Sequence, residues 1–260
     1  MKYRLTLLWT LLLVACASPV GQPPRDDIRT SSDMTDADRR AKVHLELATA
    51  YFGRGQSTTA LDELKKTLAD RPDLPEAYNL RGLIYASLGQ MPLADESFQY
   101  ALKLRPTDAD TMHNYGWVLC QRQRYDEADE LFDKAIATPQ YKGLSRTLLA
   151  KGLCQARQNK NIEAEQTLSR SYEIDPSNPA TAYSLGEVLY RLGQYDRARF
   201  YVKRVNAEPE QSNAQTLWLA TRIEHKLGDR IGVNAYGGQL RDRYPQSPEA
   251  LKFARGAFDE

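Results

Sequence analysis

Small apolar residues recur along this chain with a period of about 34 residues, set among larger apolar positions. The first set of these small residues is Ala48, Gly82, Gly116, Gly152, Gly186 and Ala220. By subtraction, the intervals between consecutive members are 34, 34, 36, 34 and 34 residues. Twelve residues after each of these stands a second small residue: Ala60, Ala94, Ala128, Ala164, Ala198 and Gly232. Two antiparallel helices approach closely only where neither carries a large side chain. Each pair of small residues therefore predicts a crossing between two consecutive helices.

A helix–turn–helix unit of 34 residues is the signature of the tetratricopeptide repeat, which stacks into a solenoid with a concave binding face. We therefore predict an all-α fold, a right-handed α-solenoid of six such repeats with a C-terminal capping helix. The predicted repeats are 41–74, 75–108, 109–142, 145–178, 179–212 and 213–246, and the cap is 247–260, within a repeat domain of 39–260. The alternative is an unrelated helical bundle, which six in-phase matches disfavour.

The first residues have the form of a secretory leader, with a positively charged start and an apolar stretch too short to span a bilayer. Residues 13–16, Leu-Val-Ala-Cys, resemble the bacterial lipobox. The resemblance implies removal of a signal peptide, 1–15, and lipidation of Cys16, while Ala17 in place of aspartate implies sorting to the periplasmic face of the outer membrane. A plain signal peptide with an incidental cysteine is the alternative. Residues 16–38, rich in Pro, Ser, Asp and Thr, are expected to be a lipidated flexible tether.

The composition points away from nucleic acid and from catalysis. The net charge is +1, and no basic run is interleaved with aromatic residues, so nucleic acid is not an expected partner. His44, His113 and His225 fall in different repeats and outside the spacings typical of metal sites. The sequence also lacks a nucleophile elbow and a phosphate loop. We expect a monomeric binding protein without enzyme activity, cofactor or metal; an enzyme with an unrecognised site is the alternative.

Cys120 and Cys154 lie on the first helices of neighbouring repeats. Counted from Gly116 and Gly152, their positions differ by two residues, which is about 200° around a helix. Side chains of opposite phase on parallel neighbouring helices can face one another, and the periplasm is oxidising. We predict a disulfide between these cysteines, with two buried free thiols as the alternative.

In tetratricopeptide repeats the first helix of each unit lines the concave groove. If the small residue is position 8, positions 2, 5, 9 and 12 face inward in the family. Carried over to this chain, the candidate protein-binding groove contains Leu45, Thr49, Phe52, Asn79, Leu83, His113 and Trp117. An apolar groove suits an amphipathic helix or an extended peptide. The alternative is that these side chains belong to the core between repeats.

Four short blocks are more specific than the repeat itself. They are His-Asn-Tyr-Gly-Trp-Val-Leu-Cys at 113–120, Tyr-Asp-Glu-Ala at 125–128, Pro-Gln-Tyr at 139–141 and Gly-Leu-Cys at 152–154. Together with the lipobox and the repeats, they resemble the type IV pilus biogenesis lipoproteins of the PilF/PilW kind. The resemblance implies a pilotin, which binds subunits of the type IV pilus secretin and promotes their outer-membrane localisation and multimerisation. The alternative is a lipidated periplasmic scaffold for cell-wall enzymes or for outer-membrane protein insertion.

Overall fold

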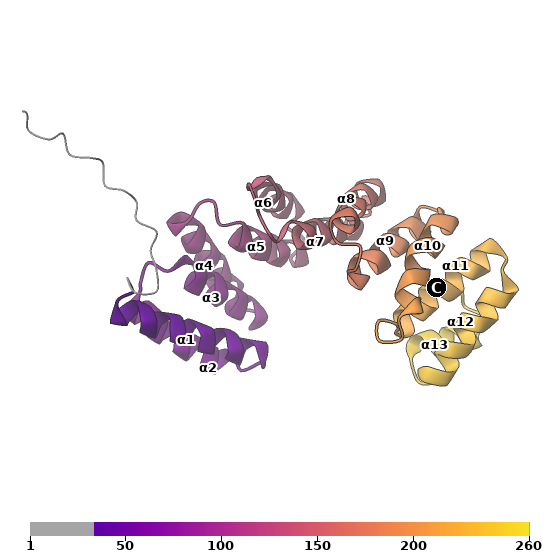
Figure 1. Ribbon diagram of the computed structural model, residues 1–260, viewed down its shortest axis with the longest axis horizontal. Helices are drawn as coiled ribbons and strands as arrows, with labels where there is room; N and C mark the ends of the chain where they lie inside the picture. Colours follow the sequence, from indigo (N-terminus) through magenta and orange to yellow (C-terminus); the bar gives the residue numbers. More distant parts are fainter. Residues whose placement is uncertain (1–33, 260) are drawn as a thin grey trace, which may run out of the picture.

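The computed structural model describes residues 34–259, which form thirteen helices joined by short connections (Figure 1). The predicted fold class is confirmed, because the helices pair into six helix–turn–helix units followed by a single helix, with no strand in this range. In chain order the helices are α1 (Asp36–Gly53), α2 (Ser57–Asp70), α3 (Pro75–Ser87), α4 (Met91–Leu104), α5 (Ala109–Gln121), α6 (Tyr125–Ala137), α7 (Leu144–Arg157), α8 (Asn161–Ile174), α9 (Pro179–Arg191), α10 (Tyr195–Ala207), α11 (Ala214–Leu227), α12 (Arg230–Arg243) and α13 (Pro248–Ala254).

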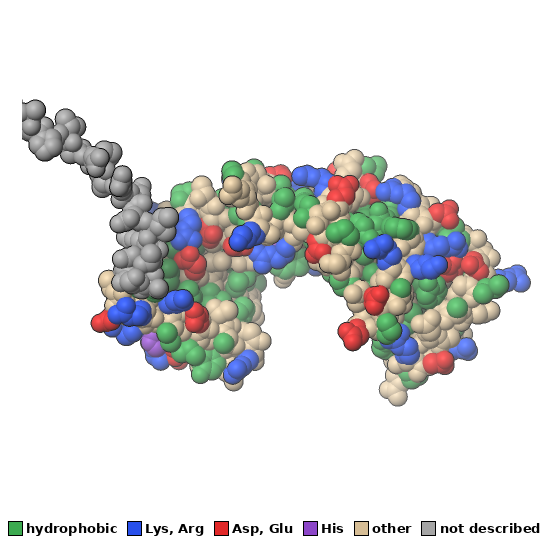
Figure 2. All heavy atoms as spheres, in the orientation of Figure 1, with side chains coloured by type: hydrophobic (Ala, Val, Ile, Leu, Met, Phe, Trp, Pro, Cys, Tyr) green, Lys and Arg blue, Asp and Glu red, His purple; other side chains and the backbone are tan. Residues whose placement is uncertain are grey.

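The six units stack side by side into an arch. Within each unit the first helix packs on the second, and the first helices α1, α3, α5, α7, α9 and α11 also contact one another in sequence. Figure 2 shows the body curving around a hollow that opens between its α1–α4 end and its α9–α13 end. At the C-terminal end, Phe253 and Phe258 pack against Leu217 and Trp218 of α11 and thereby cover the last repeat.

The first helix begins earlier than the sequence suggested. We expected a tether up to residue 38 and a first repeat from 41, whereas α1 begins at Asp36. The reason is a capping box, in which the Thr35 hydroxyl accepts from the Asp38 amide at 3.1 Å and the Asp38 carboxylate accepts from the Thr35 amide at 3.0 Å. The predicted signal peptide, the lipidation site Cys16 and most of the tether lie outside the described residues. None of the helices within 34–259 is long and apolar enough to cross a membrane.

The small residues do bring the paired helices close together. A Cβ placed on Gly82 of α3 would lie 2.8 Å from three ring carbons of Phe98 on α4, and the Phe98 side chain is fully buried. Gly186 of α9 has the same relation to Val202 of α10, with 2.4 Å to a methyl carbon. Such a Cβ would overlap its neighbour, because side chains in close-packed interiors have little room to shift.

The structure contains the predicted disulfide, which joins Cys120 on α5 to Cys154 on α7 with a Cα–Cα distance of 5.9 Å. Both cysteines are buried within the core shared by the third and fourth repeats. The bond closes a segment with a sequence separation of 34 residues, for which the loss of chain entropy in the unfolded state corresponds to about 4 kcal/mol. It therefore fixes two first helices relative to each other.

We expect Gly82→Ala to lower the free energy of unfolding by about 1–3 kcal/mol, because the added methyl group would meet the immobile Phe98 ring. Gly53→Ala is the matched control, since Gly53 also lies in a helix but a Cβ there would meet no atom within 4 Å. This control should be neutral or stabilising by up to about 1 kcal/mol. Urea unfolding of both variants checks the expectation, and equal midpoints would contradict it.

Candidate protein-binding groove

First helices α3, α5 and α7 form an apolar groove centred on Trp117, named here the Trp117 groove. One hollow, of about 320 Å³, has a lining that includes Leu83, Ala86, Met91, Trp117, Val118 and Arg122. A second hollow, of about 180 Å³, is lined by His113, Trp117, Arg146, Leu149, Ala150 and Leu153. Trp117 lines both hollows, so its half-buried indole is the shared wall between them.

The indole of Trp117 carries a cation on one face. The guanidinium carbon of Arg157, at the end of α7, lies 4.9 Å from the ring centroid. This distance is within the range of a cation–π interaction. Arg157 is exposed, and its side chain forms no ion pair or hydrogen bond with another described residue.

His113 contributes mainly to packing between repeats. Its side chain is 8% exposed, and its Nδ1 lies 3.0 Å from the Thr147 hydroxyl on α7. Burial, assisted by the positive charge of Arg146, lowers the pKa of His113 to about 4. The ring is therefore neutral at physiological pH, and it lines the smaller of the two hollows.

Asn79 and Leu83 both lie on α3 and are half-buried, but only Leu83 lines one of the two hollows. The Asn79 carbonyl oxygen accepts a hydrogen bond from the Asn114 amide on α5 at 3.1 Å, which ties the two first helices together. Leu83 lines the larger hollow beside Trp117. Of this pair, Leu83 is the residue that offers apolar surface to a partner.

The three groove candidates of the first repeat lie apart from the two hollows. Leu45 and Phe52 pack against the core formed by α1, α2 and α3. Thr49 is exposed, and its hydroxyl donates to the Leu45 carbonyl oxygen at 2.9 Å. The structure thus brings Leu83, His113 and Trp117 together and leaves the first-repeat residues outside that group.

Comparison with known proteins places this geometry in a family. Tetratricopeptide repeat models match residues 45–109, 97–130 and 155–218. The type IV pilus assembly protein PilF of Pseudomonas aeruginosa is 27% identical over 252 residues, covering 97% of each chain. The crystal structure of PilW, described as a widely conserved type IV pilus biogenesis factor, is 31% identical and has a TM-score of 0.75, covering 82% of this chain and 98% of that one. A solved structure of Pseudomonas aeruginosa PilF has the same TM-score of 0.75 at 26% identity, covering 85% of this chain and 100% of that one.

The chain belongs to the PilF/PilW family of tetratricopeptide repeat proteins. The sequence resemblance is thereby confirmed over nearly the full length of the chain. Repeat proteins of this family are typically scaffolds without catalytic activity. Among residues 34–259, no three His, Cys, Asp or Glu side chains are grouped in a way that could hold a metal ion.

This PilF/PilW-type chain also has a cleft that the sequence analysis missed. It lies between α2 and α3, has a volume of about 600 Å³, and is lined in part by Leu61, Leu64, Leu68, Arg81 and Tyr85. The leucines recur at intervals of three and four residues on one face of α2. This spacing was the sequence feature that could have indicated the cleft. It fits equally well a second helix that packs only against the first helix of its own repeat.

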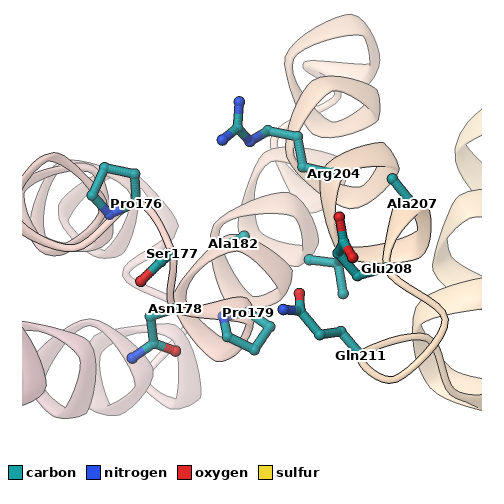
Figure 3. Close-up of a pocket in the computed structure, with 10 residues that line it drawn as sticks. Pro176, Ser177, Asn178, Pro179, Ala182, Arg204, Ala207, Glu208 and Gln211 are labelled. Atoms are coloured by element: carbon teal, nitrogen blue, oxygen red, sulfur yellow. The ribbon is translucent and has the colours of Figure 1, made fainter.

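A further hollow, of about 380 Å³, lies at the edge of the solenoid between the α8–α9 turn and the end of α10 (Figure 3). In Figure 3, Glu208 and Gln211 lie across from Pro179, and Arg204 lies above them. The Asn178 side chain accepts from the Ala180 amide at 3.0 Å and caps α9, so its carbonyl oxygen already has a structural role. The Ser177 hydroxyl, which also lines this hollow, donates a hydrogen bond to the Asp175 carboxylate at 2.6 Å.

Burial of His113 makes the stability of the fold depend on pH. The pKa of this ring falls from an ordinary 6.5 to about 4 on folding, so between these values the unfolded chain binds more protons, and the fold loses stability as pH falls. Between pH 7 and pH 5 the loss due to this residue should be about 2 kcal/mol. We expect His113→Gln, which cannot take up a proton, to lose correspondingly less over that interval in urea unfolding. Parallel pH profiles for both proteins would contradict this assignment.

Proposed function

We propose that this chain is a lipid-anchored pilotin, which binds secretin subunits of the type IV pilus and promotes their localisation and multimerisation in the outer membrane. The likeness to PilF and PilW over nearly the whole chain supports the pilus assignment. The Trp117 groove supports the binding role, and it is the observation on which the proposal chiefly rests.

The groove has the features of a site for a protein segment. A half-buried tryptophan between two hollows can bury large apolar side chains on both of its sides, and tryptophan is enriched in binding hot spots. The Cys120–Cys154 disulfide also restrains the groove, because it links α5, which carries Trp117, to α7, which carries Leu153. A preformed surface of this kind loses little conformational entropy on binding.

The proposed anchor complements the groove. Lipid attached to Cys16 would hold the repeats at the outer membrane, and only residues 17–35 separate that cysteine from α1. A chain of that length reaches on average roughly 25 Å. A secretin subunit bound in the groove would therefore be concentrated near the membrane into which it must insert.

The decisive experiment measures secretin multimers in outer-membrane fractions, with and without this gene, on gels run without full denaturation. We expect multimers to vanish without the gene while secretin monomer persists. Trp117→Ala should reduce multimers and weaken binding of the secretin periplasmic region about tenfold or more, because it removes the shared wall of both hollows. Phe200→Ala is the matched control, since Phe200 is 55% exposed on α10 and lies outside the groove.

Thermal unfolding of the Trp117→Ala protein distinguishes lost binding from lost folding, and Leu83→Gln tests the same groove if the first variant unfolds. Normal multimers in the absence of the gene would rule out a pilotin. Co-purification of a cell-wall hydrolase or an insertion-machine subunit would then favour the scaffold function.

Cys16→Ser tests the anchor. Without a sulfur to acylate, the protein should leave the outer-membrane fraction while keeping the melting temperature of its repeat domain. Metabolic labelling with radioactive palmitate, followed by fractionation, measures lipid and location together. A variant that still fractionates with the outer membrane would show that another feature supplies the address.

A further inference from the structure

Among the described residues, those that line the Trp117 groove carry positive charge and no negative charge. Arg122 and Arg146 line the two hollows, whereas no Asp or Glu does so among the described residues. Arg122 is bound to Asp95 of α4 at 2.8 Å, and Arg146 to Asp110 of α5 at 2.7 Å. Both of these arginines therefore already have a carboxylate partner outside the groove.

Arg157 is different, because among the described residues its side chain has the Trp117 ring as its only charge-related contact. A guanidinium can stack on an aromatic face and still present a fork of donors at its edge, which matches a carboxylate. The ring removes water from one side of the cation and leaves its edge open. Arg157 and Trp117 together thus offer an apolar wall and an unused pair of donors at one place.

A second place in this chain, on α11, also combines an aromatic surface with nearby cations, and there the segment that it binds is visible. In the C-terminal segment, the Phe258 ring stacks on the His225 ring of α11, with the two centroids 4.1 Å apart. Its centroid lies 5.9 Å from that of the Trp218 ring, also on α11. The Phe258 carbonyl oxygen accepts from Arg222 Nε at 2.9 Å, and the Asp259 carboxylate pairs with Lys226 at 2.6 Å. An aromatic residue followed directly by an acidic one is therefore bound between an aromatic surface and nearby cations.

We propose that the Trp117 groove recognises a peptide segment in which a large apolar residue is followed within a few positions by Asp or Glu. The apolar side chain occupies a hollow beside Trp117, and the carboxylate pairs with Arg157. This inference rests on the proposed function, since it specifies the chemistry of the secretin segment that the groove would hold.

The first test measures binding of the secretin periplasmic region to the full mature lipoprotein in detergent micelles. Arg157→Glu should weaken binding about tenfold at 50 mM salt and remove most of its dependence on salt, and Arg157→Gln should have a smaller effect. Arg170→Glu is the matched control, because Arg170 is an exposed arginine on α8 of the same repeat, with no ion pair among described residues. If Trp117→Ala abolishes binding while Arg157→Glu leaves it unchanged, the acidic-segment inference is overturned and the pilotin function stands.

A second test needs no secretin. Random 12-residue peptides displayed on phage are selected on the wild-type protein, with the Trp117→Ala protein used to remove peptides that bind elsewhere. We expect enrichment of an aromatic or large aliphatic residue followed by Asp or Glu, with about tenfold weaker binding of these peptides to Arg157→Glu. Selection on Arg157→Glu should instead enrich Lys or Arg.

Groove-binding peptides without acidic residues, or a selection that yields none, would overturn the inference. If acidic peptides are enriched but the secretin region does not bind the wild-type protein, the groove chemistry is supported and the pilotin function is the part that fails.

Discussion

The fold depends on the close approach of two helices at a small residue, and each unit repeats this contact. Sixteen residues after the small residue of the first helix, the second helix places a large apolar side chain over it: Leu64, Phe98, Phe132, Leu168 and Val202 in the first five repeats. Each of these side chains is at most 1% exposed. In the sixth repeat the residue at this offset is Tyr236, which is half-buried, and the unit relies on α13 for the rest of its cover.

This contact also determines what reaches the groove. The residue after each small residue is turned by about 100° around the first helix, which places Leu83, Trp117 and Leu153 along one line over the second, third and fourth repeats. The corresponding residue of the fifth repeat is Glu187, which pairs with Arg191 at 2.6 Å. The apolar part of the groove therefore ends where the sequence changes from an apolar to a charged side chain, although the backbone continues unchanged.

The fold was predictable because its main determinant is a distance along the chain. Small residues 34 apart, and a second set twelve further on, are visible in the sequence and translate directly into helix crossings. The disulfide was predictable for a similar reason, since the phase of Cys120 and Cys154 follows from helix geometry. The start of α1 was not, because a capping box at Thr35 extends that helix beyond the repeat pattern.

The candidate site was less predictable, because a side chain at an inward-facing position can either be buried between repeats or line the open groove. His113 and Trp117 are four residues apart on α5, yet His113 is buried against Thr147 while Trp117 stands between two hollows. Which of two adjacent inward-facing side chains is covered depends on the size of the residue opposite it on the next repeat. No periodicity in a single sequence contains that information. The α2–α3 cleft was missed for the same reason, since its width depends on how closely two repeats pack.

The two halves of the solenoid differ in the chemistry of their hollows. Leucines, Tyr85 and Trp117 are prominent in the linings between α2 and α7; the α2–α3 cleft also contains the Lys65–Asp62 ion pair, whereas arginines are the only charged residues among the described ones that line the two hollows beside Trp117. Between α8 and α12, the linings combine cations with carboxylates, as with Arg204 beside Glu208 and Arg199 beside Glu224. Arg199 and Glu224 form an ion pair, so a charged partner would gain little there. The hollows beside Trp117 offer apolar surface next to Arg157, which has no ion pair among the described residues. Both kinds of hollow lie on the same repeated backbone, so the difference in their chemistry comes from their side chains.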